Sequence, residues 1–417
     1  MKNFNRNFNL MIIGQIISLF GAAILKFALS LYVLDKTGRA EIFATILAVS
    51  TIPVIILSPI GGAIADRFNR RNLMVIFDFS SSAIVFLFAL LLLNGEPSIF
   101  LIGVVMTLLS VISTMYQPTV QSSIPVLVNE DSLIKANGVV SGIGALANIV
   151  APILGGILYS FVALKYIVIV SGISFFLSAV MEIFIKIPFK KQEMSGNVVI
   201  TILKDMKNGL QYISKTPFIL KIMFIAAALN LFIVPLFLVG MPYIIKIIMG
   251  ADSTLFGVAQ GATSFSTIFA AVVIGIIGKR LTNDKIYLWL ISLVILLLCM
   301  GLSVHPILLD LGFWISFVIF TLCAMVMVFI CTVVSIFVIT MIQKETPTEL
   351  LGKVMAILFA ASTCATPIGQ IIYGALIDSF KTRVYIPIFI ACGFAFIVAV
   401  IANVIFKEKP KEVSFYK

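Results

Sequence analysis

The sequence predicts an all-α integral membrane protein with two similar sets of six helices. Three observations support this prediction: the composition, the length of the apolar runs and the distribution of basic residues. Of 417 residues, 61% are hydrophobic and only 11% are charged, whereas a soluble domain is roughly 45–50% apolar and about 25% charged. A single globular core could not bury so much apolar surface. Lipid is therefore the expected surrounding of most side chains.

Twelve stretches are long and apolar enough to cross a bilayer, which takes about 20 residues of helix. The first six are 8–34, 41–65, 73–93, 98–125, 133–160 and 165–187, and the second six are 217–247, 254–278, 286–304, 310–341, 350–377 and 384–406. Their apolar runs are continuous and lack the alternation of β-barrel strands. We therefore predict two six-helix bundles, 1–187 and 217–417, joined by a linker at 188–216.

Basic residues are distributed unevenly between alternate loops. With both termini on one side of the membrane, that side holds 22 of the 29 lysines and arginines, and the opposite side holds six. Positive charge marks the cytoplasmic side of a membrane protein. Both termini of this multi-pass protein are therefore predicted to lie on the cytoplasmic side of the plasma membrane. The net charge of +11 reflects this topology and does not indicate nucleic-acid binding.

The linker is expected to contain one short amphipathic helix near residues 198–214. Its apolar residues are spaced as on one face of a helix, at positions 199, 203, 206, 210 and 213. Lys204, Asp205, Lys207 and Asn208 fall on the opposite face. This pattern is typical of a helix that lies on the membrane surface.

The two halves of the chain look related to each other. Span 5 contains ANIVAPILGGILY (147–159), and span 11 contains ASTCATPIGQIIYGAL (361–376). These stretches place Pro152 and Pro367 at corresponding points of the two halves. Two repeats that face each other across a site near the midplane are the usual architecture of a secondary transporter.

Charge is concentrated between the second and third apolar stretches, where the sequence reads GGAIADRFNRRN (61–72). The residues that form a motif are Gly62, Asp66, Arg67, Asn69, Arg70 and Arg71. They resemble the loop signature of the major facilitator superfamily, G-x-x-x-D-R-x-G-R-R/K. Asn69 replaces a glycine, and asparagine tolerates left-handed backbone well. The resemblance implies the twelve-helix fold of that superfamily. It also implies a cytoplasmic gate in which Asp66 and the arginines hold the bundles together when the cavity faces outward.

Two further stretches point to export. Residues 116–138 resemble the connection between spans 4 and 5 in a branch of the superfamily that contains macrolide and siderophore exporters. The stretch APILGG (151–156) resembles the G-P-x-x-G-G motif of drug/proton antiporters, with Ala151 in place of the first glycine. A helix that contains Pro152, Gly155 and Gly156 can bend and pack tightly. The resemblance therefore implies efflux and proton antiport.

Lys26 is the most unusual residue within a span. A lysine at the centre of a span costs about 2.5–3.5 kcal/mol on insertion scales, so such residues usually face a cavity. Lys26 belongs to a polar stripe on span 1, and span 4 carries a second polar stripe. In the superfamily, spans 1, 4, 7 and 10 line the central cavity. The cavity candidates are Gln15, Ser18, Lys26, Ser30, Ser110, Thr114, Gln117, Gln121, Asn230, Gln370 and Tyr373. Two interpretations of Lys26 are open: contact with an anionic substrate or a carboxylate, and snorkelling to the outer interface.

Few carboxylates lie within the spans. Asp78 is expected within reach of the arginine loop, where it would support the gate. Glu182 precedes Lys186 by four residues, so an ion pair at the membrane edge is the simplest interpretation. Asp66, Asp78 and Glu182 are the candidates for proton coupling. A uniporter and a flippase-like mechanism are also open.

These features favour a transporter over an enzyme. The chain has no phosphate-binding loop, and its one histidine, His305, has no cluster of Cys or Asp near it in the sequence. No ATPase, cofactor or metal site is therefore expected. We predict alternating-access efflux of bulky amphipathic molecules, typical of multidrug resistance, by proton antiport. A transporter of a lysophospholipid or a siderophore is the alternative, because Lys26 suits an anion. The expected partners are a small-molecule substrate, protons and the lipid bilayer, and the resemblance implies a monomer.

Overall fold

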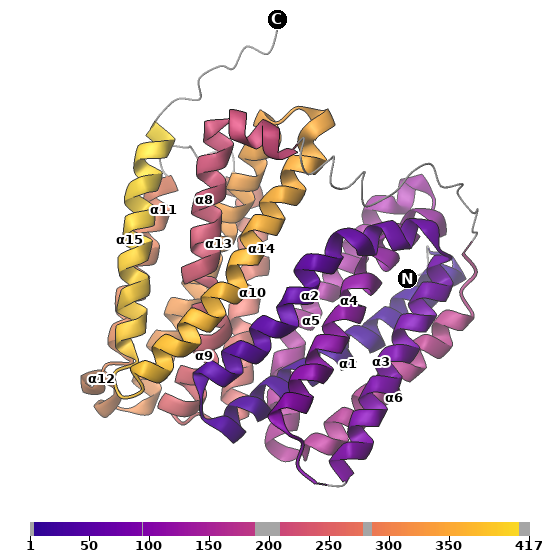
Figure 1. The fold of residues 1–417 in the computed structure, drawn as a ribbon, viewed down its shortest axis with the longest axis horizontal. Helices are drawn as coiled ribbons and strands as arrows, with labels where there is room; N and C mark the ends of the chain where they lie inside the picture. Colours follow the sequence, from indigo (N-terminus) through magenta and orange to yellow (C-terminus); the bar gives the residue numbers. More distant parts are fainter. Residues whose placement is uncertain (1–3, 94, 188–208, 278–285, 408–417) are drawn as a thin grey trace, which may run out of the picture. The chain divides into compact units, whose positions relative to one another are not determined.

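The structure is a computed structural model that describes residues 4–93, 95–187, 209–277 and 286–407 (Figure 1). Every regular element in these residues is a helix. The first six long helices are α1 (Arg6–Thr37), α2 (Ala40–Arg67), α3 (Arg70–Leu93), α4 (Ile99–Leu127), α5 (Leu133–Phe161) and α6 (Leu164–Ile183). The later ones are α8 (Pro217–Phe232), α10 (Ser253–Ile277), α11 (Ile286–Ser303), α13 (Phe313–Glu345), α14 (Thr348–Ser379) and α15 (Tyr385–Lys407). Two short helices, η1 (Glu130–Ser132) and α12 (Pro306–Asp310), lie in connections.

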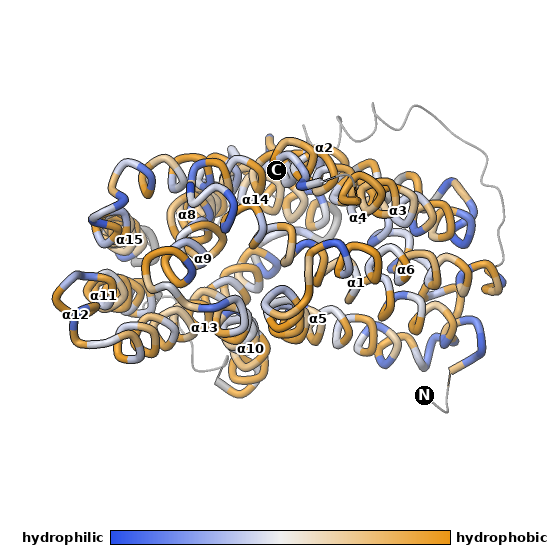
Figure 2. Tube along the Cα trace, turned by 90° about the horizontal axis from the view of Figure 1, so that it is seen from below, coloured by the Kyte–Doolittle hydropathy of each residue, from blue (hydrophilic) through white to orange (hydrophobic). Residues whose placement is uncertain are grey.

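The helices have the length and composition of membrane spans. Within the described residues, eleven helical stretches are long and apolar enough to cross a bilayer, and a further apolar helix, Tyr287–Ser303, is shorter. Figure 2 shows apolar residues along most of each helix, with hydrophilic residues mainly near the ends. The predicted all-α membrane fold is therefore confirmed. Of the surface helix predicted near 198–214, only the part from 209 onward lies among the described residues, and it is helical.

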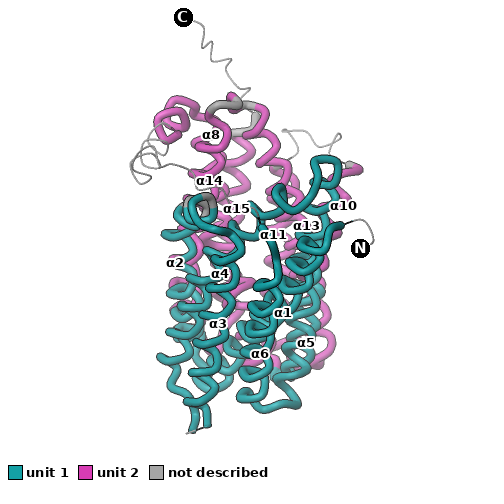
Figure 3. The backbone as a smooth tube through the Cα atoms, turned by 90° about the vertical axis from the view of Figure 1, so that its right-hand side faces the viewer, with its two compact units in different colours: residues 1–198, 250–262 teal, residues 199–249, 263–417 magenta. Residues whose placement is uncertain are grey.

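The chain divides into two compact units (Figure 3). Unit 1 comprises residues 1–198 and 250–262, and unit 2 comprises residues 199–249 and 263–417. In unit 1, α1 packs against α5 and α6, and α3 packs against α4 and α6. In unit 2, α8 packs against α14 and α15, and α11 packs against α13 and α15. These four pairings involve helices at the same serial positions of the two sets of six.

Local sequence signals fix several helix ends. Asn5 caps α1, because its side chain accepts a hydrogen bond of 2.8 Å from the backbone N–H of Phe8. Ser98 caps α4 in the same way through the N–H of Leu101, at 3.2 Å. Both residue types are preferred caps, since their side chains satisfy free N–H groups of the first turn. Gly38 ends α1 with a φ of +56°, a left-handed conformation that glycine adopts without strain.

The seventh span differs from the continuous helix expected over 217–247. After α8 ends at Phe232, the chain forms two π-helical segments, η2 (Leu236–Gly240) and η3 (Ile244–Ile248), on either side of α9 (Met241–Tyr243). Pro235 and Pro242 lie within this stretch. Proline has no N–H to donate to the helical ladder, so hydrogen bonds of the α type are interrupted there.

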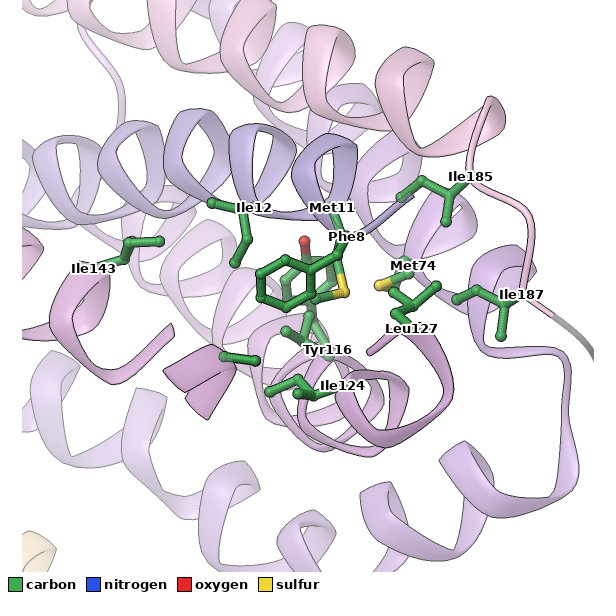
Figure 4. Packing of buried hydrophobic residues seen from close by; sticks show 12 residues of the cluster. Phe8, Met11, Ile12, Met74, Tyr116, Ile124, Leu127, Ile143, Ile185 and Ile187 are labelled. Atoms are coloured by element: carbon green, nitrogen blue, oxygen red, sulfur yellow. The ribbon is translucent and has the colours of Figure 1, made fainter. Parts of the chain in front are cut away.

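A buried apolar cluster fills the end of unit 1 where α1 begins (Figure 4). It joins α1, α3, α4, α5 and the residues after α6. Its members are Phe8, Met11, Ile12, Met74, Tyr116, Val120, Ile124, Leu127, Ala136, Ile143, Ile185 and Ile187. Tyr116 is the one member with a polar side-chain group, and its ring packs among the apolar side chains. The cluster therefore forms a dry layer at this end of the unit.

Candidate functional site

A cavity of about 330 Å³ lies within unit 1, between α1, α2, α3, α4, α5 and α6. Apolar side chains such as Leu19, Met106 and Ile112 form much of its wall. The polar and charged residues of the wall are Ser18, Lys26, Ser50, Asp78, Ser81, Ser110, Ser113, Tyr116, Gln117 and Asn148. A largely apolar wall with a few polar groups is the usual composition of a small-molecule pocket.

Lys26 projects from the middle of α1 into this cavity, and its side chain is accessible there. Among the described residues, no hydrogen bond or ion pair engages its ammonium group. An ammonium group next to apolar walls lacks the hydration that it has in bulk water. The cavity is therefore suited to bind a negatively charged group near Lys26.

Asp78 lies on α3 and is only 2% exposed. Its Oδ1 accepts a hydrogen bond of 3.0 Å from Ser18 Oγ, and its Oδ2 has no hydrogen-bond partner among the described residues. The sequence assigns Asp78 to the gate, but the structure places it on the wall of the same cavity as Lys26. Seven residues of helix separate it from Arg71, which corresponds to a rise of about 10 Å.

Glu182 lies on α6 and is fully buried. Its Oε1 accepts a hydrogen bond of 2.7 Å from the hydroxyl of Tyr116, and its Oε2 has no hydrogen-bond partner among the described residues. The interpretation of Glu182 as an ion-pair partner of Lys186 is wrong. Because α6 ends at Ile183, Lys186 is not on the next turn of the same helix, and it is exposed.

Small residues bring α1 and α6 together beside Glu182. Ser178 Oγ donates a hydrogen bond of 2.9 Å to the carbonyl oxygen of Gly14. A Cβ on Gly14 would lie 3.2 Å from Ser178 Oγ, and a Cβ on Gly21 would lie 2.8 Å from the Cβ of Ser174. Ser174, Ser178 and Glu182 follow at intervals of four residues and so share one helix face. This spacing is a sequence signal that Glu182 lies on the same small-residue face of α6 as the two serines.

The other cavity candidates divide between the wall and its surroundings. Ser18, Ser110 and Gln117 line the cavity. Thr114 instead donates to the carbonyl oxygen of Ser110 at 2.7 Å, and Gln15 is buried outside the lining. Ser30 and Gln121 also lie outside it. Tyr116 was missed, because it does not fall on the polar stripe of α4. Asn148 and Ser50 also belong to the wall.

The candidates of unit 2 lie at contacts between α8, α14 and α15. Asn230 Nδ2 donates to the carbonyl oxygen of Ala226 at 2.9 Å, and its Oδ1 lies 3.5 Å from the hydroxyl of Thr366. Gln370 is 2% exposed. The hydroxyl of Tyr373 donates to the carbonyl oxygen of Pro387 at 3.3 Å. These contacts hold the middle of α14 against α8 and α15.

The arginines of the charged motif bind the ends of two helices. Arg70 Nε donates to the carbonyl oxygen of Ala65 at 3.2 Å, and Arg71 Nε donates to the carbonyl oxygen of Ile183 at 3.2 Å. The last carbonyls of a helix have no partner within the helix and interact favourably with cations. The start of α3 is thus fastened to the ends of α2 and α6. The surroundings of Gly62 and the side chain of Asp66 lie outside the described part of the structure.

The glycines of the predicted bending motif lie at close helix contacts. A Cβ on Gly155 would lie 2.8 Å from the ring of Phe27 on α1. A Cβ on Gly156 would collide with the carbonyl oxygen of Ser253, at the start of α10. A Cβ on Gly257 would collide in turn with the carbonyl oxygen of Pro152. Such direct contact of two backbones requires residues without side chains.

Comparisons with known proteins agree with this architecture. Residues 11–339 match the family model of the Major Facilitator Superfamily. Macrolide efflux protein A of Streptococcus pyogenes is 22% identical over 381 residues, which cover 90% of this chain and 91% of that protein. The MFS-type transporter YfiS of Bacillus subtilis is 23% identical over 358 residues, which cover 86% of this chain and 82% of that protein.

Solved structures resemble the fold along nearly its whole length. A bacterial homologue of the iron transporter ferroportin has a TM-score of 0.70 and 16% identity, and the match covers 97% of this chain and 99% of that one. The nucleoside transporter NupG has a TM-score of 0.73 and 13% identity, with 97% of this chain and 100% of that one covered. At these identities the likeness concerns the fold alone.

Proposed function

This chain belongs to the Major Facilitator Superfamily, and from that premise we propose that it exports bulky amphipathic molecules in antiport with protons. It is a multi-pass membrane transporter and not an enzyme. Export is supported by the similarity to a protein named for macrolide efflux and by the Pro-Gly-Gly stretch of α5. Proton coupling is supported by the buried carboxyl group of Asp78 on the cavity wall.

The observation that carries the proposal is the cavity of unit 1, with its apolar walls, one cation and one carboxyl group. Its volume of about 330 Å³ is near the lower end of ligand pockets, which span roughly 300–1,000 Å³. A cavity of this size accepts the polar end of a larger compound. Lys26 and Asp78 would meet that end, and the apolar walls would hold the adjoining hydrophobic part.

Transport by the purified protein tests this function directly. Proteoliposomes with an acidic interior should accumulate more radiolabelled erythromycin than protein-free liposomes do. The protein-free liposomes measure the passive trapping of a weak base, which is subtracted. A protonophore should abolish the difference. Accumulation that survives the protonophore would contradict proton antiport. If neither erythromycin nor other amphipathic drugs showed protein-dependent accumulation, drug export would be wrong.

A second candidate substrate class is the anionic amphiphile, such as a lysophospholipid or a siderophore. One observation favours it: Lys26 lies in the cavity without an ion-pair partner among the described residues. A cation at this point attracts an acidic headgroup and repels a lipophilic cation.

We expect Lys26→Gln to remove the stabilisation that anionic amphiphiles confer on the protein. A bound ligand at 100 times its Kd stabilises the native state by about 2.7 kcal/mol, which raises the melting temperature in detergent. Lys36→Gln is the matched control, because Lys36 lies on the same helix but pairs with Glu96 outside the cavity. Equal stabilisation of wild type and Lys26→Gln by lysolipids and siderophores would separate Lys26 from substrate binding.

We also propose the domain boundaries, the topology and the gate of the protein. The two bundles are residues 1–187 and 217–417, the linker is 188–216, and both termini are cytoplasmic. Gly62, Asp66 and Arg67 form the cytoplasmic gate with the neighbouring arginines, and the protein acts as a monomer in the plasma membrane. The bond from Arg71 to the end of α6 supports this gate, because it would transmit a movement of the motif to the helix that carries Glu182.

A further inference from the structure

We propose that Asp78 and Glu182 form a single proton-binding site that exchanges protons with the cavity through Asp78 and is closed on the far side by the buried apolar cluster. This inference rests on the proposed proton antiport and names the groups that carry the proton. The sequence offers Asp78 and Glu182 only as separate candidates on different spans. The packing of α3 against α6 brings them into one site.

The two carboxyl groups share the same unusual surroundings. Both are nearly or fully buried, at 2% and 0% exposure, and each has one oxygen without a hydrogen-bond partner among the described residues. They lie on two helices, α3 and α6, that pack directly against each other. Two adjacent negative charges in an apolar interior carry a large energetic cost. The pair is therefore expected to hold at least one proton.

Few titratable groups lie near the pair among the described residues. Tyr116 on α4 donates to Glu182, and Lys26 on α1 lines the same cavity as Asp78 but makes no ion pair with it. The polar side chains that α2 and α5 bring to the cavity, Ser50 and Asn148, carry no charge. Because neither carboxyl group is bonded to a cation among the described residues, a retained proton reduces the charge that the apolar interior has to hold.

The two carboxyl groups differ in their access to the cavity. Asp78 lines the cavity wall, whereas Glu182 does not. Glu182 is bonded to Tyr116, whose ring belongs to the buried apolar cluster (Figure 4). Protons can therefore enter from the cavity side, and the dry cluster blocks the other end.

Tyr116 connects Glu182 with the cavity wall. Its hydroxyl donates to Glu182 at 2.7 Å, and its side chain lines the cavity together with Asp78. In a relay, the tyrosine hydroxyl gives its proton to Glu182 as it takes a proton that comes from Asp78. The proton count of the tyrosine is unchanged, and the negative charge moves from Glu182 to Asp78. Tyr116 is thus a positioning residue of this site.

Infrared difference spectroscopy of the purified protein in lipid, recorded over a pH series, tests the pair without any substrate. Protonated carboxyl groups absorb at a different infrared frequency from carboxylates. The bands of Asp78 and Glu182 are identified because they disappear in Asp78→Asn and Glu182→Gln, respectively. Because coupled groups titrate as a pair, each variant should also change the titration of the carboxyl group that remains. Tyr116→Phe should shift the frequency of the Glu182 band, because the hydrogen bond to its Oε1 is lost. Glu96→Gln, an exposed carboxyl group outside the site, should change neither band.

Several outcomes would overturn the proposal. The two bands could titrate independently, or Glu182 could keep its band unchanged in Tyr116→Phe, the mildest of the variants. Sodium ions could shift the bands at constant pH, which would make the site a metal-cation site. Failure of the pair is distinguishable from failure of the proposed function. Proton-driven efflux with independent bands contradicts only the pair, and coupled bands without any efflux contradict only the export function.

Discussion

Gly257→Ala is expected to lower the melting temperature of the protein and to impair transport. A Cβ at this position would collide with the carbonyl oxygen of Pro152, which is backbone and cannot rotate away. Gly156 on α5 and Gly257 on α10 meet at the same point, since a Cβ on either one comes within 3.3 Å of the other's Cα. Overpacking of a tight contact typically costs about 1–3 kcal/mol. The two helices would have to separate to accept the methyl group.

The matched control is Gly142→Ala, which makes the same change on α5 at a position where a Cβ meets nothing within 4 Å. Alanine is a better helix former than glycine by roughly 0.5–1 kcal/mol. Gly142→Ala should therefore leave the melting temperature unchanged or raise it, while Gly257→Ala lowers it. The melting temperatures of both variants are measured by heating the protein in detergent and monitoring its unfolding by size-exclusion chromatography. Equal behaviour of the two variants would show that the contact between α5 and α10 tolerates a side chain.

This contact shows what the sequence can and cannot predict about packing. The glycines of α5 are part of a motif, so the sequence predicts that Gly155 and Gly156 allow close approach. It does not identify the partner helix. Small residues at four-residue spacing also occur at Gly257 and Gly261 on α10, but this spacing is common in membrane helices and does not say which surfaces meet. The partner is decided by the tertiary arrangement of unit 1.

The helices themselves were largely predictable. The fourth span was predicted at 98–125 and is found at Ile99–Leu127, because apolar length and flanking polar residues determine where a helix can leave the bilayer. The seventh span was the exception. Its hydropathy is uniformly high, so the pattern contains no sign of the two π-helical segments. Pro235 and Pro242 were the only available signal, and many membrane helices accommodate proline without a π-helical segment.

The candidate site was predictable in part. The polar stripe of span 1 identified Ser18 and Lys26, because residues at four-residue spacing share one face of a helix. The surroundings of the carboxyl groups were not predictable, since they depend on helix neighbours. Asp78 was assigned to the gate because it is close to Arg71 in the sequence. Glu182 was assigned to an ion pair because it is close to Lys186 in the sequence. In the structure both carboxyl groups face other helices.

Asp78→Asn is expected to abolish proton-driven accumulation while leaving the cavity intact. Asparagine has nearly the same shape as aspartate, and its carbonyl oxygen can still accept the hydrogen bond from Ser18, which is 3.0 Å long in the structure. It cannot release or take up a proton at any physiological pH. If Asp78 couples transport to protons, the variant should therefore accumulate substrate against a gradient at least about tenfold less than wild type. A tenfold change corresponds to about 1.4 kcal/mol of coupling free energy.

Proteoliposomes can separate this loss from a general defect. Asp78→Asn should still exchange labelled for unlabelled substrate across the membrane without a pH gradient, because exchange requires the cavity and its movement but no net proton flux. Glu96→Gln is the control for a carboxyl group that pairs with Lys36 at the surface, and it should behave as wild type in both assays. If Asp78→Asn lost exchange and accumulation equally, Asp78 would serve substrate binding or the conformational change. If it retained both, the coupling proton would have to bind elsewhere in the protein.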